Sequence, residues 1–178
     1  MKLPGSLLLI LPIIALSVSG CRESAPAAPR FAFITNGVAE FWTIAEAGAK
    51  QAGTDLGVEV GVFMPGSLTD QKQMMEDAVT RGFSGVAVSP IDSSNQTDML
   101  NNVAASTKLV THDSDAPASK RLAYIGMDNY TAGRLCGQLV KEALPQGGEI
   151  IFLIGRMEQD NSRKRRQGVI DELLGRSE

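Results

Sequence analysis

The feature that most constrains the fold is a regular alternation of short apolar runs with longer helical patterns, beginning near residue 31. The apolar runs are rich in valine, isoleucine and phenylalanine, which is typical of buried β-strands. They cover residues 31–35, 58–63, 85–90, 108–112 and 122–126. Apolar strands separated by helices pair in parallel through right-handed crossovers, and the helices then cover both faces of the sheet. We therefore predict a doubly wound α/β lobe.

The helical patterns between these runs indicate which faces are buried. The segment 41–57 has small or apolar residues at every fourth position, and we predict that this face packs on the sheet: Ile44, Gly48, Ala52 and Leu56. The next two helices have the spacing of capping boxes at their starts, with Ser67 before Asp70 and Ser93 before Gln96.

The same rhythm restarts after residue 126 and is then cut short. The pattern predicts a helix over 130–144, a strand over 149–155 and a helix over 162–174. So few elements do not enclose a stable core of their own. We therefore expect a first lobe over 31–126 and the incomplete start of a second, similar lobe over 127–178.

The N-terminus has the pattern of an export signal. Lys2 precedes an apolar run over 7–16, and "VSGC" follows with small residues before Cys21. This run is too short to span a bilayer, which takes ~20 residues, so residues 1–20 are predicted to be a cleaved signal peptide. The pattern resembles the lipobox of bacterial lipoproteins, which implies lipidation at Cys21 and a membrane tether over 21–30.

Charge and cysteine content limit the classes of partner and chemistry. The net charge of −3 argues against a nucleic-acid surface, and the basic run 163–166 is expected to be a solvated helix face with Arg165 turned inward. A lipidated Cys21 leaves Cys136 without a disulfide partner. Because apolar residues surround Cys136 at helical spacing, we predict that it is a small buried hydrophobe.

Polar or glycine-rich residues follow four of the predicted strands. In open α/β sheets, ligands bind at the carboxyl ends of the strands. The sequences at these ends are "TNGVAEFW", "MPGS", "SPIDSS" and "HDSDAP". These residues suit a neutral, hydroxyl-rich ligand. A carboxylate can accept from two hydroxyls, and an aromatic face can cover the C–H groups of the ligand. We expect Asp113 to meet Phe41 and Trp42 in one crevice, although polar strand ends are also typical of simple solvated turns.

Other chemistries fit these residues less well. His112, Asp113 and Ser114 have the composition of a hydrolase triad, but adjacent strand residues point to opposite faces of the sheet. Asp113 and Asp115 lack the six or more oxygens of a calcium site, so no metal is expected. There is no GxGxxG or P-loop motif, and we expect no nucleotide or other cofactor.

Four segments taken together resemble the periplasmic sugar-binding proteins of the ribose-binding type, the solute receptors of ABC transporters. These segments are "FAFITNGVAEFWTIAEAGAKQAG", "GVAVSPID", "VTHDSDAP" and "YIGMDNYTAGRLCGQLV". The resemblance implies two lobes that close on a ligand at a hinge. It places ligand contacts on Phe41, Trp42, Asp113, Arg165 and Asn36, and the hinge on Asp128 and Asn129. Ser114 departs from the arginine that often follows the aspartate in ribose binders, which puts ribose in doubt.

The resulting expectation is a lipid-anchored, extracytoplasmic, monomeric protein that captures a sugar and delivers it to an ABC permease, without enzymatic activity. A sugar receptor that reports to a signalling partner is an alternative with the same binding site. The effector domain of a LacI-type regulator is another. That alternative needs a helix-turn-helix before the first strand, where a signal segment lies instead.

Overall fold

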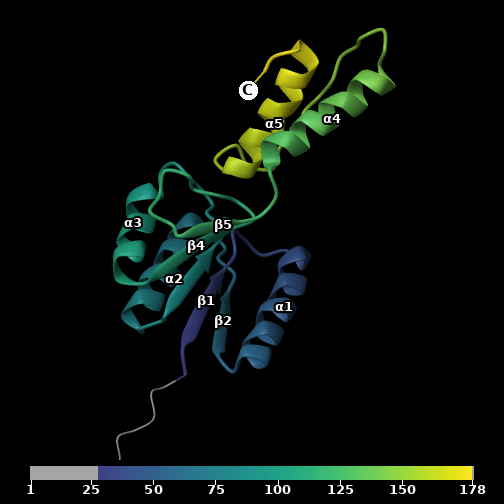
Figure 1. The fold of residues 1–178 in the computed structure, drawn as a ribbon. Coiled ribbons are helices and arrows are strands. Elements are labelled where there is room, and N and C mark those ends of the chain that lie inside the picture. Colours follow the sequence, from purple (N-terminus) through teal and green to yellow (C-terminus); the bar gives the residue numbers. More distant parts are fainter. Residues whose placement is uncertain (1–27, 178) are drawn as a thin grey trace, which may run out of the picture.

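The computed structural model describes residues 28–177, which build a parallel five-stranded sheet and five helices. The predicted signal peptide and Cys21 lie outside the described residues. The strand order is β2-β1-β3-β4-β5, and every neighbouring pair is parallel (Figure 1). The five predicted strands of the first lobe are therefore confirmed: β1 (Arg30–Ile34), β2 (Glu59–Phe63), β3 (Gly85–Val88), β4 (Lys108–His112) and β5 (Ala123–Ile125).

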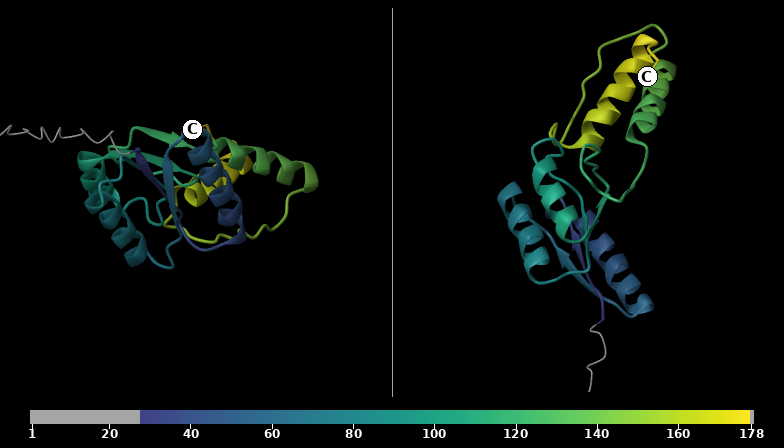
Figure 2. Two further views of the ribbon diagram at one scale, coloured as in Figure 1. Left: turned by 90° about the horizontal axis from the view of Figure 1, so that it is seen from below. Right: turned by 60° about the vertical axis from the view of Figure 1, so that its left-hand side comes forward.

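Helices cover both faces of this sheet, as a doubly wound fold requires. Helix α1 (Glu40–Leu56) lies on one face, and α2 (Leu68–Thr80) and α3 (Thr97–Ser106) lie together on the other (Figures 1 and 2). Met75 of α2 and Leu100 of α3 are fully buried in the core against the sheet. The strand order reverses between β1 and β3, so the topological switch point lies between these two strands.

Helix α1 packs on the sheet with a different face from the one we predicted. Ile44 and Leu56 are both about three-quarters exposed, at 76% and 74%, whereas Trp42 and Gly53 are buried. A Cβ atom at Gly53 would lie 2.9 Å from Cγ2 of Val60. The helix lies so close to β2 at this point that only glycine fits, and the bulkier apolar residues are therefore left on the outer face.

The two predicted capping boxes have different outcomes. Ser67 is the N-cap of α2, and its side chain accepts a hydrogen bond from the backbone N–H of Asp70. The prediction for Ser93 is wrong, because α3 begins at Thr97 and the carboxylate of Asp92 accepts from the backbone N–H of Asn95 instead. This leaves the Ser93 hydroxyl available for a partner elsewhere in the fold.

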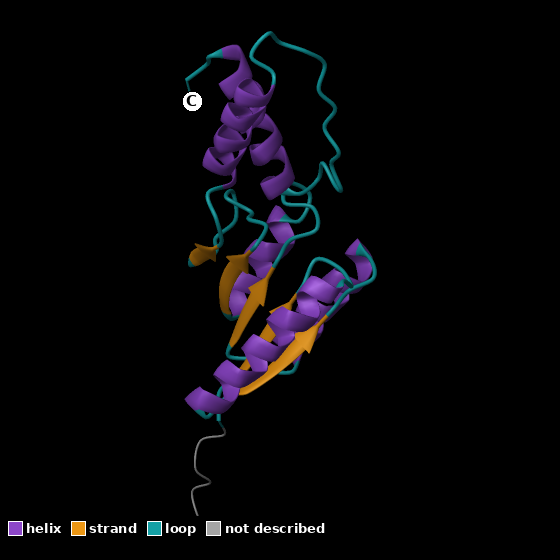
Figure 3. Cartoon of the chain, turned by 90° about the vertical axis from the view of Figure 1, so that its right-hand side faces the viewer, coloured by secondary structure: helices purple, strands orange, loops and turns teal. Residues whose placement is uncertain are grey.

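The remaining helices, α4 (Asn129–Ala143) and α5 (Asp160–Leu174), form a pair beyond the carboxyl ends of the strands (Figures 1 and 3). Both predicted helices of the second lobe are confirmed. Their contact is very close: a Cβ atom at Gly133 would lie 2.2 Å from the carbonyl oxygen of Arg165, and one at Gly168 would lie 2.2 Å from that of Tyr130.

Two predictions for the second lobe are wrong. The segment 149–155 is not a strand, and Ile151 and Leu153 within it are 87% and 96% exposed. A strand needs a neighbour to pair its backbone groups, and no strand among residues 28–177 lies beside this one. Cys136 is exposed rather than buried, because α4 turns its glycines, Gly133 and Gly137, toward α5.

Candidate functional site

Asp113 lies directly after β4 and brings together the ends of three strands. Its backbone has φ of 55°, a left-handed conformation that aspartate tolerates better than most residues. One carboxylate oxygen, Oδ2, accepts hydrogen bonds of 3.1 Å from Nδ2 of Asn36, which follows β1, and from the hydroxyl of Ser89, which follows β3. Since β1 and β3 flank the switch point, the carboxylate lies where ligands bind in folds of this kind.

Asn36 connects this carboxylate to the aromatic pair of α1. Its side-chain oxygen accepts a 3.2 Å hydrogen bond from the indole N–H of Trp42. The rings of Phe41 and Trp42 meet edge to face, with centroids 4.9 Å apart. Trp42 is only 5% exposed, whereas Phe41 is 62% exposed. The structure thus brings together Asn36, Trp42 and Asp113, with Phe41 on the outer side of Trp42.

His112 packs beneath the aromatic pair. Its ring stacks on Phe33 with centroids 4.2 Å apart and meets Trp42 edge to face at 5.6 Å. Burial lowers the pKa of His112 to about 4, so its imidazole is neutral at physiological pH. Neither Nε2 of His112 nor the hydroxyl of Ser114 has a hydrogen-bond partner among residues 28–177. Residues 112–114 therefore do not form a nucleophile and base pair.

A cleft of about 480 Å³ opens beside Asn36 and Trp42. This volume is within the usual range of small-molecule sites. Gly155, Arg156 and Gln159 of the second lobe also line this cleft, whereas Phe41 and Asp113 do not. A larger groove of about 620 Å³ lies between α2 and α3, away from the strand ends described above.

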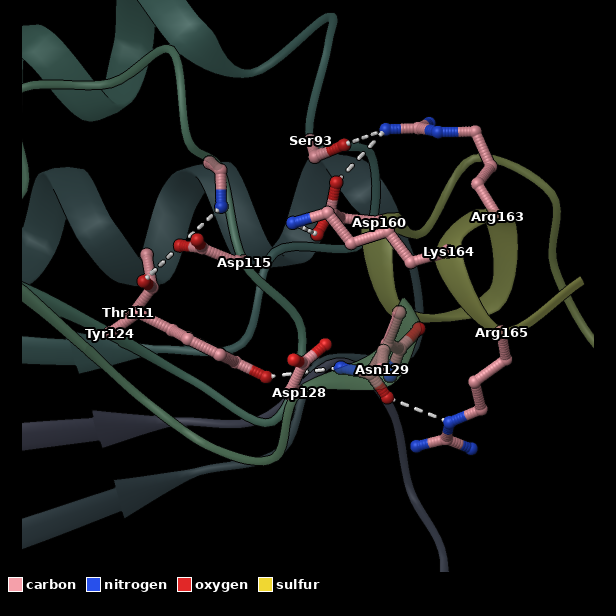
Figure 4. Close-up of polar contacts among 12 residues, drawn as sticks. Ser93, Thr111, Asp115, Tyr124, Asp128, Asn129, Asp160, Arg163, Lys164 and Arg165 are labelled. Carbon is pink, nitrogen blue, oxygen red and sulfur yellow. Dashed lines mark hydrogen bonds and ion pairs between the residues drawn. The ribbon is translucent and has the colours of Figure 1, made fainter. Parts of the chain in front are cut away.

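The two lobes contact one another at Ser93. The guanidinium of Arg163, on α5, donates from Nη2 to the Ser93 hydroxyl at 2.7 Å (Figure 4). Its Nη1 donates to the carbonyl oxygen of Glu158 at 2.9 Å. The backbone N–H of Ser93 donates to the same carbonyl at 3.3 Å. The start of α5 is thereby attached to the loop that follows β3.

A second set of contacts runs through the predicted hinge. Nε of Arg165 donates to the side-chain oxygen of Asn129 at 2.7 Å, and Nδ2 of Asn129 donates to the Tyr124 hydroxyl at 3.2 Å (Figure 4). That hydroxyl donates in turn to the carbonyl oxygen of Asp113 at 2.8 Å. Burial raises the pKa of Tyr124, which keeps this phenol protonated. Asp128 caps α4 by accepting from the backbone N–H of Thr131.

Arg165 thus contacts the crossover between the lobes and does not line the cleft beside Asn36 and Trp42. Its ligand contact and the hinge role of Asp128 and Asn129 stay predictions. Sequence reasoning missed Ser89 and Asn161, although Nδ2 of Asn161 lies 3.5 Å from the Asp113 carboxylate. Ser89 ends the run "GVAVS" as Asp113 ends "LVTHD", so its position at a strand end was a usable signal.

Asp115, the other acid of this loop, has a structural role. Arg121 donates from Nη2 to its Oδ2 at 2.7 Å, and the Thr111 hydroxyl donates to its Oδ1 at 2.6 Å. Burial favours the protonated acid, but these donors more than offset that effect and hold the pKa of Asp115 below its ordinary value. Among residues 28–177, no three His, Cys, Asp or Glu side chains are grouped as a metal site would need.

The family model described as "Periplasmic binding protein domain" matches residues 31–177. The chain belongs to this family. Its fold is that of the family's sugar receptors: one solved relative is an ABC transporter solute-binding protein from Burkholderia graminis in complex with D-arabinose, with 28% identity and a TM-score of 0.78. Another is a carbohydrate transporter solute-binding protein from Agrobacterium radiobacter, also with D-arabinose, with 23% identity and a TM-score of 0.77.

A glucose-galactose binding protein from Geobacillus stearothermophilus has the same fold, with 24% identity and a TM-score of 0.77. These matches cover 83%, 84% and 83% of this chain, but only 52%, 54% and 54% of the respective solved chains. The chain therefore spans about half the length of the structures it matches. No helix among residues 28–177 is both long and apolar enough to cross a membrane.

Proposed function

We propose that this chain contributes the first lobe and part of the second lobe of an extracytoplasmic solute-binding lipoprotein, which captures a sugar and delivers it to an ABC permease. The main support is the hydrogen-bonded set of Asn36, Ser89 and Asp113 at the switch point, in which Asn36 also bonds to the indole of Trp42 and lines the cleft. Family membership and the sugar complexes of the relatives agree with this function.

The chemistry of the set suits a neutral polyol. Asn36 and Ser89 both donate to Oδ2 of Asp113, whereas Oδ1 accepts no hydrogen bond from residues 28–177. Two sugar hydroxyls donate to such a carboxylate, and these charge-assisted hydrogen bonds are stronger than neutral ones. Phe41 supplies an exposed apolar surface for the C–H side of a ring.

Capture depends on closure of the second lobe over the ligand. The Ser93–Arg163 and Tyr124–Asn129 hydrogen bonds hold the lobes together at two points. A sugar that contacts both walls of the cleft favours the closed arrangement by its differential affinity for that arrangement. A permease that recognises the closed form then receives only loaded receptor.

Binding is tested by calorimetric titration of the chain without residues 1–20 against a panel of pentoses and hexoses, beginning with D-arabinose. We expect saturable binding of at least one sugar, with a matching change in the emission of Trp42, the one tryptophan of the chain. Absence of heat and of fluorescence change across the panel would refute the proposal for this chain.

Lipidation is tested separately by metabolic labelling of the full chain with palmitate in a bacterial host. We expect label in the wild type and in a Cys136→Ser control but none in Cys21→Ser, because these are the two cysteines of the chain. Label that persists in Cys21→Ser would contradict the proposed anchor. Co-purification with a permease, compared with a sensor kinase, distinguishes delivery from signalling.

A further inference from the structure

We propose that Gln71, a fully buried residue of α2, is a positioning residue that holds the partners of Asp113 in place. The proposal rests on the binding role given above to the set of Asn36, Ser89 and Asp113. Gln71 itself lies on the opposite face of the sheet from α1 and does not line the cleft. Its contacts nevertheless converge on the ends of the two strands that flank the switch point.

The side-chain amide of Gln71 uses its full hydrogen-bonding capacity. Nε2 donates to the carbonyl oxygens of Thr35 at 2.7 Å and Ser89 at 2.8 Å. Oε1 accepts from the backbone N–H of Ile91 at 3.2 Å and from Nε2 of Gln96 at 2.8 Å. Two donors and two acceptor positions are all that an amide side chain offers. One side chain therefore ties the end of β1 to the end of β3 and to the loop before α3.

These bonds lie just beyond the final backbone bond between β1 and β3, in which the N–H of Ser89 donates to the carbonyl oxygen of Ile34 at 2.9 Å. The last aligned pair of β1 and β3 is Ile34 with Val88. The carbonyls of Thr35 and Ser89 lie one residue beyond that pair, and Gln71 supplies a donor to each. Asn36 follows Thr35 directly, and Nδ2 of Asn36 also donates to the Ser89 hydroxyl at 3.0 Å, so fixing both carbonyls supports this direct contact. These two groups are the donors to Oδ2 of Asp113.

No apolar or acidic side chain of similar length reproduces this arrangement. Methionine fills a similar volume but leaves two carbonyls and one N–H without the bonds that Gln71 makes, and buried polar groups without partners are costly. A carboxylate would place an acceptor against two carbonyl acceptors. The geometry of the site therefore depends on the amide chemistry of Gln71, in addition to its contribution to packing.

The test compares Gln71→Met with Met75→Ala, a change one turn later on α2 at an equally buried position whose side chain packs in the apolar core. The first readout needs no sugar. The indole N–H of Trp42 gives a unique NMR signal, and its hydrogen exchange reports the bond to Asn36. We expect at least tenfold faster exchange in Gln71→Met and less than twofold change in Met75→Ala.

The second readout is sugar affinity under conditions where both variants are folded. We expect Gln71→Met to bind at least tenfold more weakly and Met75→Ala to bind within twofold of the wild type. An unchanged indole signal in Gln71→Met would overturn the positioning role, whether or not sugar binds. If the indole signal changes in Gln71→Met but the wild type binds no sugar, the positioning role stands and only the proposed function is refuted.

If Gln71→Met does not fold, Gln96→Met provides the milder perturbation. It removes one of the four bonds to Gln71 and leaves the bonds to Thr35 and Ser89 intact. We expect an increase in indole exchange smaller than tenfold but larger than that of Met75→Ala. Exchange equal to that of Met75→Ala would overturn the positioning role.

Discussion

Asn36 donates a 3.1 Å hydrogen bond to the carboxylate of Asp113 across 77 positions of sequence. The same Asn36 side chain accepts from the indole of Trp42 at 3.2 Å. The aspartate after β4 and the aromatic pair of α1 are therefore parts of one connected set, with β1 and β3 supplying the connection. This relationship makes the site sensitive to changes in either strand end.

Under the proposed function, Asp113→Ala is expected to abolish sugar binding, because it removes the acceptor for Asn36 and Ser89 together with the proposed acceptor for the ligand. Alanine at this position also retains the conformational strain of a left-handed backbone at φ 55°, which lowers the stability of the folded protein. Asp113→Gly relieves that cost and should be more stable than Asp113→Ala by about 1 kcal/mol. Calorimetric titration and urea unfolding measure the two effects. Sugar binding by Asp113→Gly would show that the carboxylate does not contact the ligand.

Stability should fall on acidification because of His112. Its pKa is about 4 in the folded protein and 6.5 in the unfolded chain, so the unfolded state binds more protons between these values. The loss of stability due to His112 is absent above pH 6.5 and reaches about 3 kcal/mol at pH 4. Unfolding in urea, followed by Trp42 emission, measures it.

His112→Phe is the control for this effect, since phenylalanine retains an aromatic ring between Phe33 and Trp42 but does not titrate. Between pH 6.5 and 4, we expect His112→Phe to lose about 3 kcal/mol less stability than the wild type. Equal losses in the two proteins would mean that carboxylates account for the acid sensitivity.

Arg121→Ala should destabilise the first lobe by about 3 kcal/mol, because it leaves the buried carboxylate of Asp115 without its cation. The double variant Arg121→Ala with Asp115→Asn should recover part of this loss, since it removes the charge as well. Thermal unfolding of both proteins gives the comparison. A double variant no more stable than Arg121→Ala would contradict the role assigned to the ion pair.

Gly168→Ala should separate α4 from α5, because its Cβ atom would lie 2.2 Å from the carbonyl oxygen of Tyr130. Gly48→Ala is the matched control in α1. Apart from its chain neighbours and the adjacent backbone of its own helix, its new Cβ atom would meet no atom within 4 Å, and the change should stabilise the protein by up to about 1 kcal/mol. Circular dichroism during thermal unfolding detects both changes. If Gly168→Ala is as stable as the wild type, α4 and α5 can move apart without loss of stability, which would contradict the importance of this close contact.

The sequence by itself determined the parallel sheet, the order of its elements and the position of Asp113 at the end of a strand, since these depend on local periodicity and on which residues follow each strand. Tertiary structure decided the rest. The buried face of α1 depends on the close approach of Gly53 to β2, and the conformation of 149–155 depends on whether a neighbouring strand is present. The contacts of Ser93 with Arg163 and of Gln71 with two strand ends join residues far apart in sequence, and no local pattern encodes such pairing.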